Sequence, residues 1–263
     1  MTISGSKAAS LLPFGYLAVT RIRGVRDLAY HVATSWLPAI WLVVRLTDLG
    51  PAMATGQFLL GYLAFIAAYE IGYLANDAWD SKRSSNGRER VRFPIDGIYV
   101  ALFLLVRLGV WALVAMVTGW FENLLWLAGY GVLVIAFAQH NLVQSRGLRL
   151  ASFYELATLR FLLPVTAILS ADAMVSALLV AMLLYAFPRF LSYMESKDLL
   201  VLEERRAPAF GFCLQLSIAP LMLYLAWMFR MSVLAELLAY FLAIHATWWL
   251  LVSAGKAQPQ PKE

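Results

Sequence analysis

Apolar residues occur along the chain in long runs that short polar breaks interrupt. Runs of this length predict membrane-crossing helices, because about 20 apolar residues are needed to span the hydrocarbon core of a bilayer. Breaks such as Gly50-Pro51, Gly119 and the segment 170–172 contain residues that favour turns. We place eight spans, at residues 28–47, 52–76, 96–118, 121–143, 151–170, 172–194, 208–229 and 231–253.

This layout predicts an all-α fold, a polytopic transmembrane helical bundle that occupies residues 28–254. Hydrophobic residues make up 62% of the chain and charged residues only 14%, which excludes an ordinary soluble domain. Residues 1–27 are predicted to form an N-terminal tail with a basic interfacial helix over 14–26. The polar segment 255–263 is predicted to be a disordered tail.

The distribution of Lys and Arg orients the predicted bundle. Eight spans place both termini on one side of the membrane, and 16 of the 21 Lys and Arg then fall on that side, against Arg45 and Arg230 on the other. Because basic residues gather in cytoplasmic loops, both termini are predicted to be cytoplasmic. We expect an integral, multi-pass protein of a bacterial inner membrane. The net charge of +5 then reflects basic loops rather than a nucleic-acid partner.

A dense polar cluster follows the second predicted span. Asp80 lies four residues after Asn76 and three after Asp77. On a helix, these spacings bring the three side chains to roughly one face. Three oxygen-bearing side chains on one face would form half of a site for a hard cation such as Mg²⁺. The alternative is a solvated helix end before a topology-setting loop. The loop carries basic residues suited to a phosphate, which include Arg88, Arg90 and Arg92.

A second polar cluster ends the sixth predicted span. Glu195 and Asp198 are three residues apart and are predicted to share a helix face. Both clusters end even-numbered spans, so both are predicted to lie on the cytoplasmic side, where they could meet across the bundle. Carboxylates from two helices could then hold Mg²⁺ while nearby basic residues bind a diphosphate. Arg189, Tyr193 and Lys197 flank this cluster.

Ionisable residues inside the predicted spans form a third group of candidates, because they usually face a protein interior or a watery cavity. Glu70 would extend the polar cavity inward, and Arg107 would either pair with Glu70 or reach toward the interface. Arg160 would bind an anionic substrate or form a buried ion pair, for which Glu155 is one candidate. His245 is expected to be a packing residue.

The first cluster resembles a motif of the UbiA-type intramembrane prenyltransferases. In that family, N-D-x-x-D-x-x-x-D follows the second span and precedes a basic loop that ends in R-P. This chain has Asn76-Asp77-x-x-Asp80, a basic loop and Pro94. The family's second acidic motif follows the sixth span, as the second cluster does here, and the resemblance covers most of the chain.

This resemblance implies Mg²⁺-dependent transfer of a polyprenyl group from a polyprenyl diphosphate to a lipid-soluble acceptor at the bilayer. The catalytic residues would be Asp77, Asp80 and Asp198. The metal ligands would be Asn76, Asp77, Asp80, Glu195 and Asp198. The substrate-binding residues would be Arg88, Arg90, Arg92, Arg160, Arg189, Tyr193 and Lys197.

Departures from the family pattern keep other functions open. Ser84 stands where the motif has its last Asp, and Phe93 stands before Pro94 where the family has Arg. The family usually has nine spans, against eight here. One alternative is phosphoribosyl or glycosyl transfer to a polyprenyl phosphate, and a second is a non-catalytic UbiA-like scaffold. A transporter or channel is a third, although the charges gather at one face rather than at the bilayer midplane.

Overall fold

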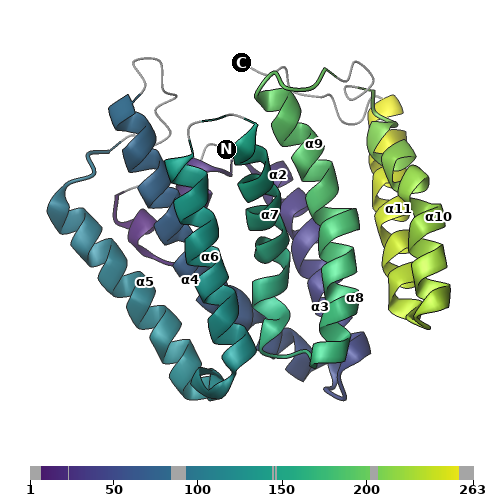
Figure 1. Ribbon diagram of the computed structural model, residues 1–263, viewed down its shortest axis with the longest axis horizontal. Helices are drawn as coiled ribbons and strands as arrows, with labels where there is room; N and C mark the ends of the chain where they lie inside the picture. Colours follow the sequence, from purple (N-terminus) through teal and green to yellow (C-terminus); the bar gives the residue numbers. More distant parts are fainter. Residues whose placement is uncertain are drawn as a thin grey trace. The chain divides into compact units, whose positions relative to one another are not determined.

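The computed structural model describes residues 7–22, 24–83, 93–143, 145, 147–201 and 207–254, with the side chains of 79–83 excepted. These residues form helices joined by short turns, and no strand occurs among them. The chain divides into two compact units, Met1–Ser170 and Ala171–Glu263. Figure 1 draws the helices of both.

The helical stretches coincide with the predicted runs. In the first unit they are α2 (Val25–His31), η2 (Val32–Trp36) and α3 (Leu37–Leu46), which are continuous, then α4 (Pro51–Arg83), α5 (Gly97–Thr118), α6 (Leu124–Leu142) and α7 (Leu148–Thr166). In the second unit they are α8 (Ala171–Leu179), η4 (Val180–Ala186) and α9 (Phe187–Ser196), also continuous, then α10 (Phe210–Met228) and α11 (Ser232–Ser253).

Six helical segments in the described part of the chain are long and apolar enough to cross a membrane. They are α4 as far as Ala78, α5, α6, the continuous segment from α8 to α9, α10 and α11. The all-helical, multi-pass character predicted from the sequence is therefore confirmed. The stretch 25–46 and α7 are not among the six, so the count of eight spans stays a prediction.

Helix α4 is the centre of the first unit. It packs against α3, α5, α6 and α7. In its most apolar stretch of 18 residues, 61% is buried, against 22% in the corresponding stretch of α5. Gly61 permits the contact with α7, because a Cβ there would lie 2.0 Å from the carbonyl oxygen of Pro164. The polar end of α4 is therefore carried on a helix that contacts four other helices of the unit.

The segments η2 and η4 are π-helical, and each lies shortly before a proline. The N–H of Leu37 donates to the carbonyl of Val32 and that of Phe187 to Met182, each five residues back. Pro38 and Pro188 follow directly and cannot donate. A π turn is one way in which a helix accommodates such a gap. In the second unit, η4 continues directly into α9, which carries Glu195 of the second polar cluster.

In the second unit, α10 and α11 pack against each other and against η4. His245 on α11 hydrogen-bonds through Nδ1 to the carbonyl oxygen of Phe241 at 2.7 Å, and its ring lies against Gly211 of α10. This environment supports the packing role expected for His245.

Candidate functional site

The N-terminal segment folds back onto α4 and α5 as a compact hook, residues 7–21. It contains η1 (Ala9–Leu11) and α1 (Gly15–Thr20). The chain reverses between them at Phe14, whose φ is 70°, and at Gly15. A Cβ on Gly15 would lie 1.9 Å from the carbonyl oxygen of Ala9, so only glycine fits this turn.

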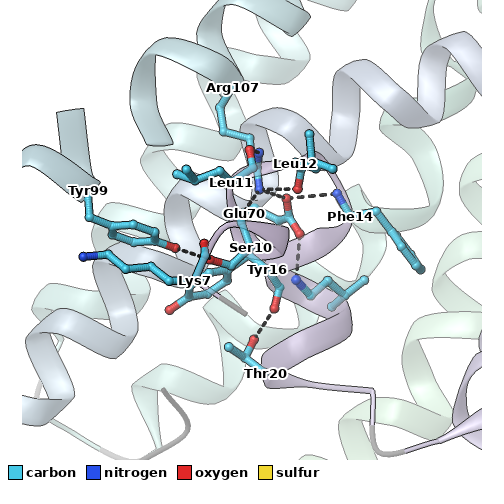
Figure 2. A network of polar contacts seen from close by, with 11 residues as sticks. Lys7, Ser10, Leu11, Leu12, Phe14, Tyr16, Thr20, Glu70, Tyr99 and Arg107 are labelled. Carbon is cyan, nitrogen blue, oxygen red and sulfur yellow. Dashed lines mark hydrogen bonds and ion pairs between the residues drawn. The ribbon is translucent and has the colours of Figure 1, made fainter. Parts of the chain in front are cut away.

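A buried ion pair lies under the hook. Arg107 Nη2 of α5 and Glu70 Oε2 of α4 are 2.7 Å apart, and both side chains are fully buried (Figure 2). The pairing confirms one of the two roles that the sequence suggested for Arg107. Glu70 was expected to extend an open polar cavity, but its carboxylate contacts the hook.

Glu70 binds the start of α1 through main-chain groups. Its Oε2 accepts the N–H of Phe14 at 3.1 Å, and its Oε1 accepts the N–H of Leu17 at 2.7 Å. The first N–H groups of a helix have no partner within it, and a carboxylate there also interacts favourably with the helix dipole. Glu70 therefore acts as a cap that comes from a different helix.

Arg107 binds the carbonyl groups of the preceding turn. Its Nη2 donates to the carbonyl oxygens of Ser10 at 3.0 Å and Leu12 at 2.7 Å, and its Nη1 donates to that of Leu11. With the two bonds of Glu70, the pair satisfies five main-chain groups of the hook (Figure 2). Buried charges are tolerable when they are paired and hydrogen-bonded in this way.

The beginning of the hook is tied to the start of α5. Asp96 caps α5 by accepting the N–H of Tyr99 at 2.7 Å, and Lys7 Nζ donates to its other oxygen at 2.6 Å. The hydrogen bond from Lys7 lowers the pKa of the exposed Asp96 carboxyl. Ser10 Oγ lies 2.8 Å from the Tyr99 hydroxyl and joins the same network.

The end of the hook reaches the first predicted cluster. The Tyr16 hydroxyl donates to Asp77 Oδ2 at 2.8 Å, and Arg21 Nη2 donates to Asp77 Oδ1 at 2.8 Å. Burial, with the nearby charge of Asp77, raises the pKa of Tyr16, so the phenol keeps its proton and remains a donor. Burial alone would lower the pKa of Arg21, but its bond to Asp77 raises it. Both oxygens of Asp77 therefore hold the hook.

Two arginines approach one tyrosine beside Asp77. The Arg21 guanidinium lies over the Tyr73 ring, 4.7 Å from its centroid. Arg160 of α7 places Nη1 3.4 Å from the Tyr73 hydroxyl and lies 5.8 Å from the Tyr69 centroid. Arg160, a predicted substrate-binding residue, is thus brought to the polar end of α4. Its role as an anion ligand stays a prediction.

The remaining residues of the first cluster are placed in part. Helix α4 continues to Arg83, so Asn76 and Asp80 lie four positions apart on one helix face, as the spacing predicted. Asn76 is half-buried, and the side chain of Asp80 lies outside the described structure. The predicted phosphate ligands Arg88, Arg90 and Arg92 also lie outside the described residues.

The second cluster differs from its prediction. Helix α9 ends at Ser196, and Asp198 follows it with φ 57°. The N–H groups of Asp198 and Leu199 donate at 3.0 Å to the carbonyls of Glu195 and Met194, in the pattern that closes a helix with a left-handed residue. The prediction that Glu195 and Asp198 share a helix face is therefore wrong. A spacing of three residues gave no sign that Asp198 ends the helix.

The cations of the second cluster lie over aromatic rings. Arg189 Nη1 donates to the carbonyl oxygen of Tyr185 at 3.1 Å, and its guanidinium lies 3.7 Å from the Tyr185 centroid. Lys197 Nζ lies 5.5 Å from the Tyr193 centroid. Each cation thus has an aromatic contact close to it in sequence, and the substrate-binding roles of both stay predictions.

Among the side chains that the structure describes, which do not include that of Asp80, no three His, Cys, Asp or Glu gather closely enough to hold a metal ion. Tyr16, Arg21 and Tyr73 also lie beside the candidate site. The sequence pattern did not indicate this, because Arg21 belongs to the basic residues that predict only membrane topology. Comparisons of the chain with protein-family models, curated proteins and solved structures find no match.

Proposed function

We propose that the chain is a divergent, UbiA-like integral-membrane transferase that moves a polyprenyl group from a polyprenyl diphosphate to a lipid-soluble acceptor with Mg²⁺. The observation that carries the proposal is the polar end of α4. There, Asn76 and Asp80 occupy one helix face, and Arg21 and Arg160 lie nearby on other segments. Oxygen ligands for a cation beside arginines suit a metal–diphosphate group.

The residues of α4 fit a metal ion unequally. The amide oxygen of Asn76 and the carboxylate of Asp80 are hard oxygen donors on one face and would hold Mg²⁺. Asp77 does not fit, because Tyr16 and Arg21 already donate to both of its oxygens. When bound, Mg²⁺ would neutralise charge on the departing diphosphate.

The other proposed roles, binding of the diphosphate and of the polyprenyl chain, would be carried out by side chains of the protein without the metal ion. Arg160 would bind diphosphate oxygens and orient the donor. The apolar surfaces of the spans would accommodate the polyprenyl chain. Phosphoribosyl transfer to a polyprenyl phosphate would use the same anion contacts.

A non-catalytic UbiA-like membrane scaffold is the second candidate function. The observation that favours it is again Asp77, an acidic residue of the motif that serves to anchor the hook. If the remaining motif residues were also structural, the chain would bind neither metal nor diphosphate.

Binding of Mn²⁺, as a paramagnetic substitute for Mg²⁺, separates the two candidates. We expect the purified chain to bind the ion more tightly when a non-hydrolysable prenyl bisphosphonate is present, because the two ligands share one site. Asp80→Asn should abolish this coupling, and Asp172→Asn, which removes an exposed carboxylate at the start of α8, should preserve it. Independent binding of the two ligands, or no binding, would favour the scaffold.

A further inference from the structure

Tyr73 is the centre of a polar group that the predicted motifs do not include. It lies on α4, one helical turn before Asn76. Arg21 covers its ring at 4.7 Å and Arg160 approaches its hydroxyl at 3.4 Å. The two guanidinium groups come from the hook and from α7, segments that are far apart in sequence but meet on one side chain.

Arg21 retains an unused donor within this group. Its Nη2 is bound to Asp77, but its Nη1 is buried from solvent and finds no hydrogen-bond acceptor among the residues that the structure describes. A buried guanidinium N–H without an acceptor is unfavourable. An anion that accepted this hydrogen bond would remove the deficit, and the planar guanidinium suits the oxygens of a phosphate.

The hook fixes the position of Arg21 in advance. The N–H of Arg21 donates to the carbonyl of Leu17 at 2.8 Å, which closes α1. The N–H of Leu17 is in turn bound by the buried Glu70 at 2.7 Å. A donor held in place before its ligand arrives loses less conformational entropy on binding. The buried ion pair thus positions Arg21 without touching any ligand itself.

We propose that Arg21, Tyr73 and Arg160 form a binding site for a phosphate oxyanion. We assign the diphosphate of the polyprenyl donor as its ligand, and this assignment rests on the proposed function. The same chemistry could come from the phosphate of an anionic lipid headgroup. In either case the N-terminal hook supplies a ligand residue, and its role is not confined to setting topology.

Inorganic diphosphate is the probe that tests the site, measured by calorimetry on the full-length chain in neutral detergent with a chelator present. We expect binding to the wild type, and weakening of roughly tenfold or more in Arg21→Gln and in Arg160→Gln, since each loses a charge-assisted hydrogen bond. Arg45→Gln removes an exposed arginine at the end of α3 and should bind as the wild type does.

Further measurements distinguish a donor diphosphate from a lipid headgroup as the source of the phosphate, and distinguish failure of the site from failure of the proposed function. In phosphatidylcholine nanodiscs, added phosphatidylglycerol should compete weakly; full displacement of diphosphate by that lipid would assign the site to headgroups and overturn the donor assignment. If Arg21→Gln does not fold, Arg21→Lys keeps the charge and should show an intermediate loss. Unchanged affinity in either arginine variant, or no binding to the wild type, would overturn the site. Binding without prenyl transfer would overturn only the proposed function.

Discussion

Glu70 and Arg107 differ from an ordinary buried ion pair because each also binds main-chain groups of the hook. An isolated buried pair can often be replaced by apolar residues of similar volume with little loss of stability. Here the replacement would leave the N–H groups of two hook residues and the carbonyls of Ser10 and Leu11 without their partners, while the Leu12 carbonyl would keep only the N–H of Gly15. A buried main-chain group left unsatisfied costs about 1–3 kcal/mol.

The double variant Glu70→Leu/Arg107→Met tests this distinction. We expect it to unfold at a temperature lower by roughly 10 °C or more, because four main-chain groups lose their partners together and the Leu12 carbonyl loses one of two. The measurement is thermal unfolding of the purified chain in detergent. Asp172→Leu/Arg45→Met removes one charge of each sign from exposed positions and should have little effect. A double variant as stable as the wild type would mean that other contacts hold the hook.

At the scale of elements, the helices were predictable and the hook was not. Long apolar runs located every long helix, because burial in lipid or protein requires that composition. The hook is held through main-chain atoms, the N–H groups of Phe14 and Leu17 and the carbonyls of residues 10–12, which carry no sequence signal. The sequence predicted one basic helix over 14–26, whereas α1 ends at Thr20 and α2 begins at Val25. The pairing of Arg107 with Glu70 was accessible, since ionisable residues inside spans seek partners.

The candidate site was predictable to a similar degree. The motif residues Asn76 and Asp80 lie on a helix, as their spacing required. The ligands of Asp77 come from a segment more than 50 residues away, and the spacing of residues within α4 could not reveal them. Asp198 was misplaced because helix ends depend on local left-handed geometry that Asp only occasionally adopts.

Close packing of α4 on α7 gives a prediction with an internal control. Gly61→Ala should destabilise the first unit, because the new Cβ would meet the Pro164 carbonyl oxygen at 2.0 Å and the two helices would have to separate. Gly56→Ala, on the same helix with nothing within 4 Å, should be neutral or slightly stabilising. Thermal unfolding of both variants checks this. Equal effects would show that α4 and α7 can separate without loss.

At the scale of the whole molecule, the predicted orientation can be read by cysteine labelling. Cys213 is the only cysteine, so Cys213→Ala provides a background without thiols. In intact cells, a cysteine at Ser145 or Leu199 should react with a membrane-impermeant maleimide only after the membrane is permeabilised, because both positions are predicted to be cytoplasmic. A cysteine at Asn123 or Asp172 should react from the opposite side. Labelling of both pairs from the same side would refute the predicted span parity and the cytoplasmic termini.

Release of inorganic diphosphate from a polyprenyl diphosphate is the most direct test of the proposed transferase. Membranes that contain the overproduced chain should release diphosphate with Mg²⁺ and form a prenylated lipid in equal amount. A chelator and Asp80→Ala should each reduce release to the level of membranes without the protein, and Asp172→Ala should leave it unchanged. Release no greater than that background from the wild type, or equal release from Asp80→Ala, would contradict the assignment.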